Sequence, residues 1–139
     1  MSDAIHVLFL CPHAAAKSVL AMTYFAALAA EVGLEATVSN AGTEPDQEIN
    51  PAVYRYLLEE GFDLTGFKPT HLMAHHLDAA DLIVSLGCLY PEQAPAGKQF
   101  LDWADVPMLS DSLQTSRDII HEKVRQLSTA LNGDNELVG

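Results

Sequence analysis

The chain has 139 residues, of which 49% are hydrophobic, and it carries a formal net charge of −12 from 19 acidic and 7 basic residues. This length fits one domain, and the apolar fraction predicts a packed globule rather than a disordered segment. The acidic balance argues against nucleic acid as a partner, because phosphate backbones would be repelled. No apolar run approaches the ~20 residues that cross a bilayer, and no export leader is recognisable. We therefore expect a cytoplasmic protein without a membrane partner.

Strands and helices are expected to alternate along the first part of the chain. Residues 5–10 form a nearly continuous apolar run, which is typical of a strand buried on both faces of a parallel sheet. Residues 18–31 are rich in alanine and leucine, with Gly33 just past their end, and predict a helix. A short second strand is expected over 34–38, followed by a turn-forming segment over 40–46.

The middle of the chain repeats this alternation. Asn50 and Pro51 are a favourable N-cap and first helical residue, so a helix is expected from there to near Gly61. The mostly apolar residues 81–86 predict a third parallel strand, and residues 100–101 predict a short fourth strand.

The last expected element is an amphipathic helix that ends near residue 131. Asp111 or Ser112 is expected to cap its start, and residues 132–139 are expected to form a flexible tail. Strands that alternate with helices give a parallel sheet covered on both faces. We therefore predict an α/β fold, with one three-layer domain over residues 1–131 and a four-stranded parallel sheet flanked by helices.

Four short segments follow the predicted strands and are expected to meet at one edge of the sheet. These segments begin at Cys11, Gly42, Cys88 and Trp103. Ligands of open parallel sheets bind beyond the carboxyl ends of the strands. We therefore expect the functional site at this edge.

The segment from Cys11 to Ser18 joins the first strand to the first helix and is the candidate site. The N–H groups of such a loop can turn inward below a helix N-terminus and bind an anion. The same positive field favours the thiolate form of Cys11, while Lys17 could neutralise a bound oxyanion and Ser18 could hydrogen-bond the sulfur. An alternative is that Cys11 is a buried residue at a strand end and Lys17 a solvated helix residue. The residues between them are Pro12, His13, Ala14, Ala15 and Ala16.

Several short motifs, in the same order over nearly the whole chain, resemble those of the low-molecular-weight tyrosine phosphatases. The match is closest to the arsenate reductase branch of that family. The first motif is the strand that ends in Cys11, followed by five residues, the cation Lys17 and then Ser18. The others lie at residues 40–45, 49–53, 61–64, 68–69, 81–88, 97–98, 102–103 and 117–118. The resemblance implies the flavodoxin-like topology of that family.

The resemblance also implies a chemistry for the loop. In that family the loop cysteine attacks phosphorus or arsenic, the loop N–H groups and an arginine hold the charged oxygens, and a late aspartic acid protonates the leaving group. Carried over, Cys11 is the nucleophile, Ser18 stabilises its thiolate and Lys17 holds the anion. Asp105 is the nearest equivalent of the acid, and Asp111 is a second candidate.

The resemblance further implies which small molecules and partners the chain meets. The implied ligand is a small oxyanion, arsenate or phosphate, or a phosphorylated substrate. No bound cofactor and no metal are implied. The implied reductant is a small-molecule thiol or a thioredoxin-type protein.

Three residues of the loop depart from the family pattern. Lys17 stands where the family has arginine, and lysine offers one flexible point charge instead of a planar two-pronged clamp. Ala14 stands where the family has asparagine, and Ala16 where the reductase branch usually has glycine. An alanine held at positive φ costs roughly 1 kcal/mol. Because the loss of one oxyanion donor typically lowers a rate by ~10²–10³, we expect the loop to be weakened.

Cys88 is the only other cysteine and a candidate redox partner. Reductases of this type use further cysteines to resolve the oxidised nucleophile, but Glu92 occupies the place of a nearby second one. A disulfide between Cys11 and Cys88 requires their Cα atoms to lie within ~7 Å. In the alternatives, a small thiol attacks the arseno-enzyme directly, or Cys88 is simply a buried apolar thiol.

The histidines do not predict a metal site. His71, His75 and His76 lie close together in the sequence, but no cysteine or carboxylate follows them at a spacing typical of zinc ligands. We expect a capping or surface role for them. His13, inside the loop, could contact a bound anion or face solvent.

Three functional readings remain open from the sequence. The first is an enzyme of the arsenate reductase or small phosphatase type. The second is a catalytically impaired relative that serves as a binding or regulatory module, since three loop residues are replaced. The third is a thiol enzyme whose substrate is not an oxyanion, which would explain lysine at position 17. The natural substrate, the electron donor and the oligomeric state are not specified by the sequence.

Overall fold

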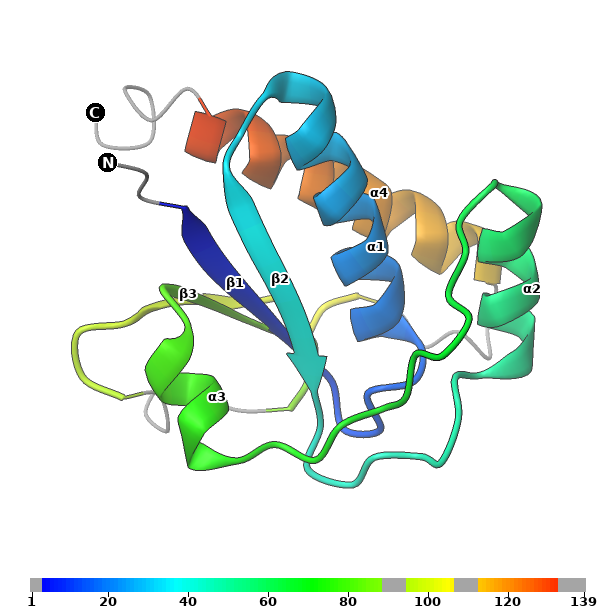
Figure 1. Cartoon of the computed structure of the whole chain (residues 1–139), viewed down its shortest axis with the longest axis horizontal. Helices are drawn as coiled ribbons and strands as arrows, with labels where there is room; N and C mark the ends of the chain where they lie inside the picture. Colours follow the sequence, from blue (N-terminus) through cyan, green and yellow to red (C-terminus); the bar gives the residue numbers. More distant parts are fainter. Residues whose placement is uncertain (1–3, 89–94, 107–112, 133–139) are drawn as a thin grey trace.

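A parallel four-stranded sheet with helices on both faces forms the fold (Figure 1). The computed structural model describes residues 4–88, 95–106 and 113–132. The strand order is β2-β1-β3-β4, and every neighbouring pair is parallel. The strands are β1 (Ile5–Leu10), β2 (Ala36–Ala41), β3 (Leu82–Ser85) and β4 (Gln99–Asp102). The helices are α1 (Lys17–Val32), α2 (Pro51–Glu59), α3 (Ala74–Ala79) and α4 (Leu113–Asn132). The predicted α/β class and the four-stranded parallel sheet are confirmed.

The apolar run of β1 separates two hydrophobic cores. Because side chains alternate along a strand, Val7 and Phe9 face the core that α1 and α4 cover, whereas Leu8 and Leu10 face the core beside α3. All four side chains are fully buried. Figure 1 shows α1 and α4 on one side of the sheet and α3 on the other. β1 is therefore buried on both faces, as the sequence predicted.

The helix ends follow their sequence signals. Gly33 ends α1 in the left-handed conformation, with its N–H directed at the carbonyls of the last turn. Asn50 caps α2, because its side-chain oxygen accepts hydrogen bonds from the N–H groups of Ala52 and Val53. Both helices therefore end or begin within a residue or two of the predicted positions.

The second strand is the element that the sequence placed wrongly. It was expected over 34–38, but β2 begins at Ala36 and continues through Ala41 into the segment expected to be a turn. Asn40 and Ala41 pair with Phe9 and Leu10 of β1. Pairing with a buried neighbour therefore outweighs the low strand propensity of asparagine and alanine.

Helix α3 was not predicted from the sequence.

The expected capping residues Asp111 and Ser112, and the tail beyond residue 132, lie outside the described residues. Among the residues described, no helix is both long enough and apolar enough to cross a membrane.

Candidate active site at the carboxyl edge of the sheet

Cys11 leaves the carboxyl end of β1 and directs its sulfur at the first turn of α1. Its Sγ lies 3.0 Å from Oγ of Ser18, and the backbone N–H of Ser18 donates to the same sulfur with an N···S distance of 3.4 Å. Cys11 is 4% exposed and Ser18 is fully buried. The strand end and the helix start therefore bring these two predicted site residues into direct contact.

The loop between them presents unpaired backbone N–H groups. Ala16 is the N-cap of α1 but offers no side-chain cap to the helix. Within residues 4–88, 95–106 and 113–132, the N–H groups of His13, Ala15, Ala16 and Lys17 have no hydrogen-bond partner. Unpaired N–H groups at a helix N-terminus carry positive partial charge and bind oxyanions.

Ala14 retains the left-handed turn of the loop without a side chain suited to it. Its φ is 54°, and it is the only non-glycine residue at positive φ in the part of the chain that is described. Its N–H donates to the Cys11 carbonyl, 3.1 Å away. Alanine carries a strain of roughly 1 kcal/mol in this conformation, which contacts from outside the turn can offset.

Asn40, at the end of β2, supplies one of these outside contacts. Its side-chain Nδ2 lies 3.1 Å from the Ala14 carbonyl oxygen and 3.0 Å from Oγ of Ser18. Sequence reasoning missed this residue, because it assigned Asn40 to a turn. The signal that could have revealed it is a side-chain amide at the carboxyl end of a strand, directly before Ala41 and Gly42.

The segment that follows β2 holds the outer side of the loop. Gly42 is packed so tightly that a Cβ on it would lie 2.4 Å from the carbonyl oxygens of both Cys11 and Pro12. Only glycine fits this approach without moving the loop backbone. Three backbone bonds continue the attachment: Glu44 N–H to Pro12 O, Asp46 N–H to His13 O, and Asn50 N–H to Ala15 O.

His13 is fastened to the same segment by its ring. Its Nδ1 lies 2.9 Å from the main-chain oxygen of Glu44 and 3.4 Å from a carboxylate oxygen of Asp46. A carbonyl oxygen only accepts, so Nδ1 carries the proton. The ring is more than half exposed.

Lys17 and Asp105 are less closely joined to the loop. The Nζ of Lys17 donates to the Val106 main-chain oxygen at 3.4 Å. The Asp105 side chain is 73% exposed, and its carboxylate lies 3.6 Å from Nζ of Lys123 on α4. The structure therefore brings Lys17 to the segment that contains Asp105 but does not bring the Asp105 carboxylate onto the loop. Asp111, the other candidate acid, lies outside the described residues.

Cys88 lies at the same edge of the sheet, after β3. Its N–H donates to Oγ of Ser85 at 3.0 Å, and its Sγ lies 4.0 Å from Oγ1 of Thr43. Burial raises the pKa of the Cys88 thiol, and Cys11 adds to this, while the contacts with Thr43 act in the opposite direction. Both cysteines are free thiols.

The three histidines near α3 do not gather metal ligands. His76 caps α3 by accepting the N–H of Met73 at 2.9 Å, and His75 lies against its ring. His71 precedes the helix and pairs with Gly42 in an isolated bridge. In the described segments no group of three or more histidine, cysteine or acidic side chains is arranged to hold a metal ion.

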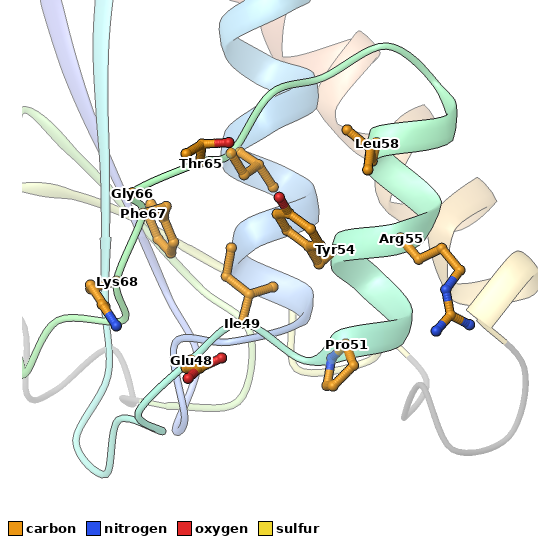
Figure 2. A pocket seen from close by; sticks show the side chains of 11 residues that line it. Glu48, Ile49, Pro51, Tyr54, Arg55, Leu58, Thr65, Gly66, Phe67 and Lys68 are labelled. Atoms are coloured by element: carbon orange, nitrogen blue, oxygen red, sulfur yellow. The ribbon is translucent and has the colours of Figure 1, made fainter.

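A cavity of about 540 Å³ lies beside the loop, between α2 and residues 64–68 (Figure 2). Ile49 lies among the lining side chains, and the charged residues Glu48 and Lys68 also line the cavity. None of the residues from Cys11 to Ser18 lines it. Sequence reasoning did not find this cavity. Asn50, between the lining residues Ile49 and Pro51, donates its N–H to the Ala15 carbonyl oxygen of the loop.

The sequence of the chain is similar to those of known proteins. The family model described as low molecular weight phosphotyrosine protein phosphatase matches residues 6–137. A protein of Halobacterium salinarum (strain ATCC 700922 / JCM 11081 / NRC-1), named "Putative arsenate reductase", is 26% identical over 132 residues. This match covers 91% of the present chain and 93% of that protein.

Two solved structures extend the comparison. A thioredoxin-dependent arsenate reductase of Corynebacterium glutamicum has a TM-score of 0.80 and 28% identity over 96% of this chain, which spans only 65% of that one. An arsenate reductase of Archaeoglobus fulgidus DSM 4304 has a TM-score of 0.68 and 27% identity, over 88% of this chain and 98% of the other. With the family model matching nearly from end to end, the chain belongs to the low molecular weight phosphotyrosine protein phosphatase family.

Proposed function

We propose that the protein is an enzyme of the arsenate reductase or small phosphatase type, in which the Cys11 thiolate attacks a tetrahedral oxyanion. The observation that carries this proposal is the pair of contacts from Ser18 to the Cys11 sulfur, next to four loop N–H groups without a partner in the described residues. A thiolate beside an anion-binding nest is what nucleophilic attack on phosphorus or arsenic requires.

In the first step, Sγ of Cys11 forms a bond to phosphorus or arsenic while the bond to the leaving oxygen breaks. The leaving oxygen takes the electron pair and a proton, which we assign to Asp105 or Asp111. The N–H groups of the loop and Nζ of Lys17 stabilise the charge on the remaining oxygens. For a phosphate ester, water then attacks phosphorus, the S–P bond breaks and the thiolate is regenerated.

For arsenate, the second step is a reduction. A second thiol attacks the Cys11 sulfur, the electron pair of the S–As bond moves to arsenic, and arsenite leaves as a disulfide forms. Cys88 at the same sheet edge could supply this thiol, and a thioredoxin-type protein would then reduce the disulfide. Alternatively, a small-molecule thiol attacks Cys11 directly. The Corynebacterium glutamicum relative is thioredoxin-dependent, which supports the first route.

The proposal is tested by turnover with two substrates. Arsenite release from arsenate, with thioredoxin or a small thiol as donor, measures reduction, and release of p-nitrophenol from p-nitrophenyl phosphate measures hydrolysis. We expect at least one activity in the wild type and none above background in Cys11→Ser. Equal rates in the two proteins, for both substrates, would contradict the proposal.

A second candidate function is a binding or regulatory module that keeps the loop but not its turnover. The contact between Nζ of Lys17 and the Val106 main-chain oxygen favours it, because this contact engages the only side-chain cation of the loop. Binding of phosphate or arsenate measured by calorimetry, together with no turnover of either substrate, would favour this candidate over the enzyme.

A further inference from the structure

We propose that Asn40 is a positioning residue for Cys11, because its side-chain amide turns the Ser18 hydroxyl toward the sulfur. The inference rests on the proposed role of Cys11 as the nucleophile. It assigns a function to a residue that lies on β2, outside the loop and its flanking helix.

The orientation of the Asn40 amide is fixed by its two neighbours. Asn40 is 5% exposed, and its Nδ2 faces the Ala14 carbonyl oxygen at 3.1 Å and Oγ of Ser18 at 3.0 Å. A carbonyl oxygen can only accept a hydrogen bond, so the atom that faces it must be the NH₂ group. This group has two protons, and each has one partner.

The bond from Asn40 decides which way the Ser18 hydroxyl can donate. A hydroxyl has one proton and two lone pairs. When a lone pair of Oγ accepts from Asn40, the proton remains for the other neighbour, the Cys11 sulfur at 3.0 Å. A thiolate cannot donate, so it accepts one hydrogen bond from this hydroxyl and a second from the backbone N–H of Ser18. Two donors then stabilise the negative sulfur.

The same amide braces the turn of the loop. Ala14, Ala15 and Ala16 have no polar side chain, so the middle of the loop cannot brace itself. Ala14 nevertheless holds a φ of 54°, and its carbonyl oxygen accepts the second proton of the Asn40 amide. The neighbouring strand therefore supplies a contact that the alanine-rich loop lacks.

The position of Asn40 on β2 is specific. Side chains alternate along a strand, and Asn40 pairs with Phe9, whose ring lies in the core on the α1 side. The preceding residue, Ser39, contacts His6 on the opposite face of the sheet. A donor one residue earlier on β2 would therefore point away from the loop.

A double-mutant cycle on Asn40 and Ser18 tests this role. The readout is the rate at which iodoacetamide alkylates Cys11 at mildly acidic pH, divided by the rate at alkaline pH. Cleavage after Lys17, Arg55 and Lys98 places the two cysteines on different tryptic peptides, so mass spectrometry follows Cys11 alone. The ratio reports the thiolate fraction, which a general loss of stability does not change.

We expect Asn40→Leu and Ser18→Ala each to lower this ratio by about tenfold, the effect of one hydrogen bond to a charged group. The double variant should fall no further than Ser18→Ala, because Asn40 acts through the hydroxyl. Asn40→Ala repeats the cycle with a smaller side chain in case the leucine variant does not fold. Ser128→Ala is the matched control, because it removes another buried hydroxyl, one that donates to the Arg125 main-chain oxygen on α4, and it should leave the ratio unchanged.

Two results would overturn the inference. One is an unchanged ratio in a folded Asn40 variant, and the other is a double variant whose loss equals the product of the two single losses. Turnover is not part of this readout. If the variants give the expected ratios but the protein shows no turnover, the result counts against the proposed reaction and not against the role of Asn40.

Discussion

The Nζ of Lys17 lies 3.4 Å from the main-chain oxygen of Val106, so the side-chain cation of the loop is held by the segment that follows β4. An ammonium group makes such a contact as a point charge and, unlike a guanidinium, cannot bind two oxygens of an oxyanion in a bidentate way. The consequence is that anion binding depends chiefly on the backbone N–H groups of the loop, and this leads to the first prediction.

Lys17→Arg should raise turnover by about tenfold to a hundredfold, because a guanidinium can hold two oxyanion oxygens at once. The measurement is kcat/KM for arsenate reduction and for hydrolysis of p-nitrophenyl phosphate. Lys98→Arg is the matched control, since Nζ of Lys98 also donates to a main-chain oxygen, that of Asp78, away from the loop. No gain from Lys17→Arg in a folded protein would count against the enzyme and favour the binding module.

Gly42→Ala should displace the loop. The new Cβ would lie 2.4 Å from two carbonyl oxygens, so the backbone of Cys11 and Pro12 must move. We expect a loss of about 1–3 kcal/mol in the free energy of unfolding, by analogy with overpacking elsewhere, and slower turnover. Gly33→Ala is the control, because it places alanine at positive φ with nothing within 4 Å of the new Cβ. Equal effects of both changes on turnover would show that the contact with the loop is unimportant.

The buried phenol of Tyr24 leads us to expect a loss of stability at alkaline pH. Its hydroxyl contacts a carboxylate oxygen of Glu60 and receives a hydrogen bond from Nε of Arg117 at 3.1 Å. Burial raises the pKa of the Tyr24 phenol, and Glu60 raises it further, while Arg117 acts in the opposite direction. The unfolded tyrosine ionises near pH ~10, so above that pH the folded state holds a proton that the unfolded state loses.

The contribution of Tyr24 to the free energy of unfolding is therefore fully present below pH ~10. It is lost as the pH rises toward the raised pKa that Tyr24 has in the folded protein. Urea unfolding measured over a series of alkaline pH values should show this decline. Tyr24→Phe removes the titrating group and should flatten that part of the profile. Identical alkaline profiles for the two proteins would refute the assignment.

Arsenate should drive a disulfide between Cys11 and Cys88 if reduction follows the two-cysteine route. Mass spectrometry without reductant would then find the peptides of the two residues joined after one turnover. Cys88→Ser cannot form this link and should depend on an added small thiol. A wild-type protein that reduces arsenate without ever joining the two peptides would favour direct attack by a small thiol.

Much of the fold follows from signals that are local in the sequence. β1 was predictable because a run of apolar residues is typical of a strand buried on both faces, and α2 because asparagine and proline open it. The end of β2 was not, since Asn40 and Ala41 are poor strand formers that pair only because β1 lies beside them. Short-range sequence patterns do not reveal the stabilisation that comes from pairing with a neighbouring strand.

The loop of the site was predictable from the sequence, whereas the residues from other elements that contact it were not. The spacing from Cys11 to Ser18 marked the loop, because that spacing is a property of one continuous segment. The contact of Asn40 with Ser18 joins residues from two elements, and the cavity near Ile49 depends on how α2 packs against residues 64–68. The attachment of Asp105 to Lys123 likewise appears only when α4 is in place.

The most direct test of the proposed chemistry is protection of Cys11 from iodoacetamide by phosphate and by arsenate, read on the tryptic peptide that contains it. We predict that either anion slows alkylation of Cys11 in a saturable way, because it occupies the N–H groups that surround the sulfur. Sulfate-free buffer with chloride at equal ionic strength is the reference. Alkylation of Cys11 at the same rate with and without both anions would contradict the account.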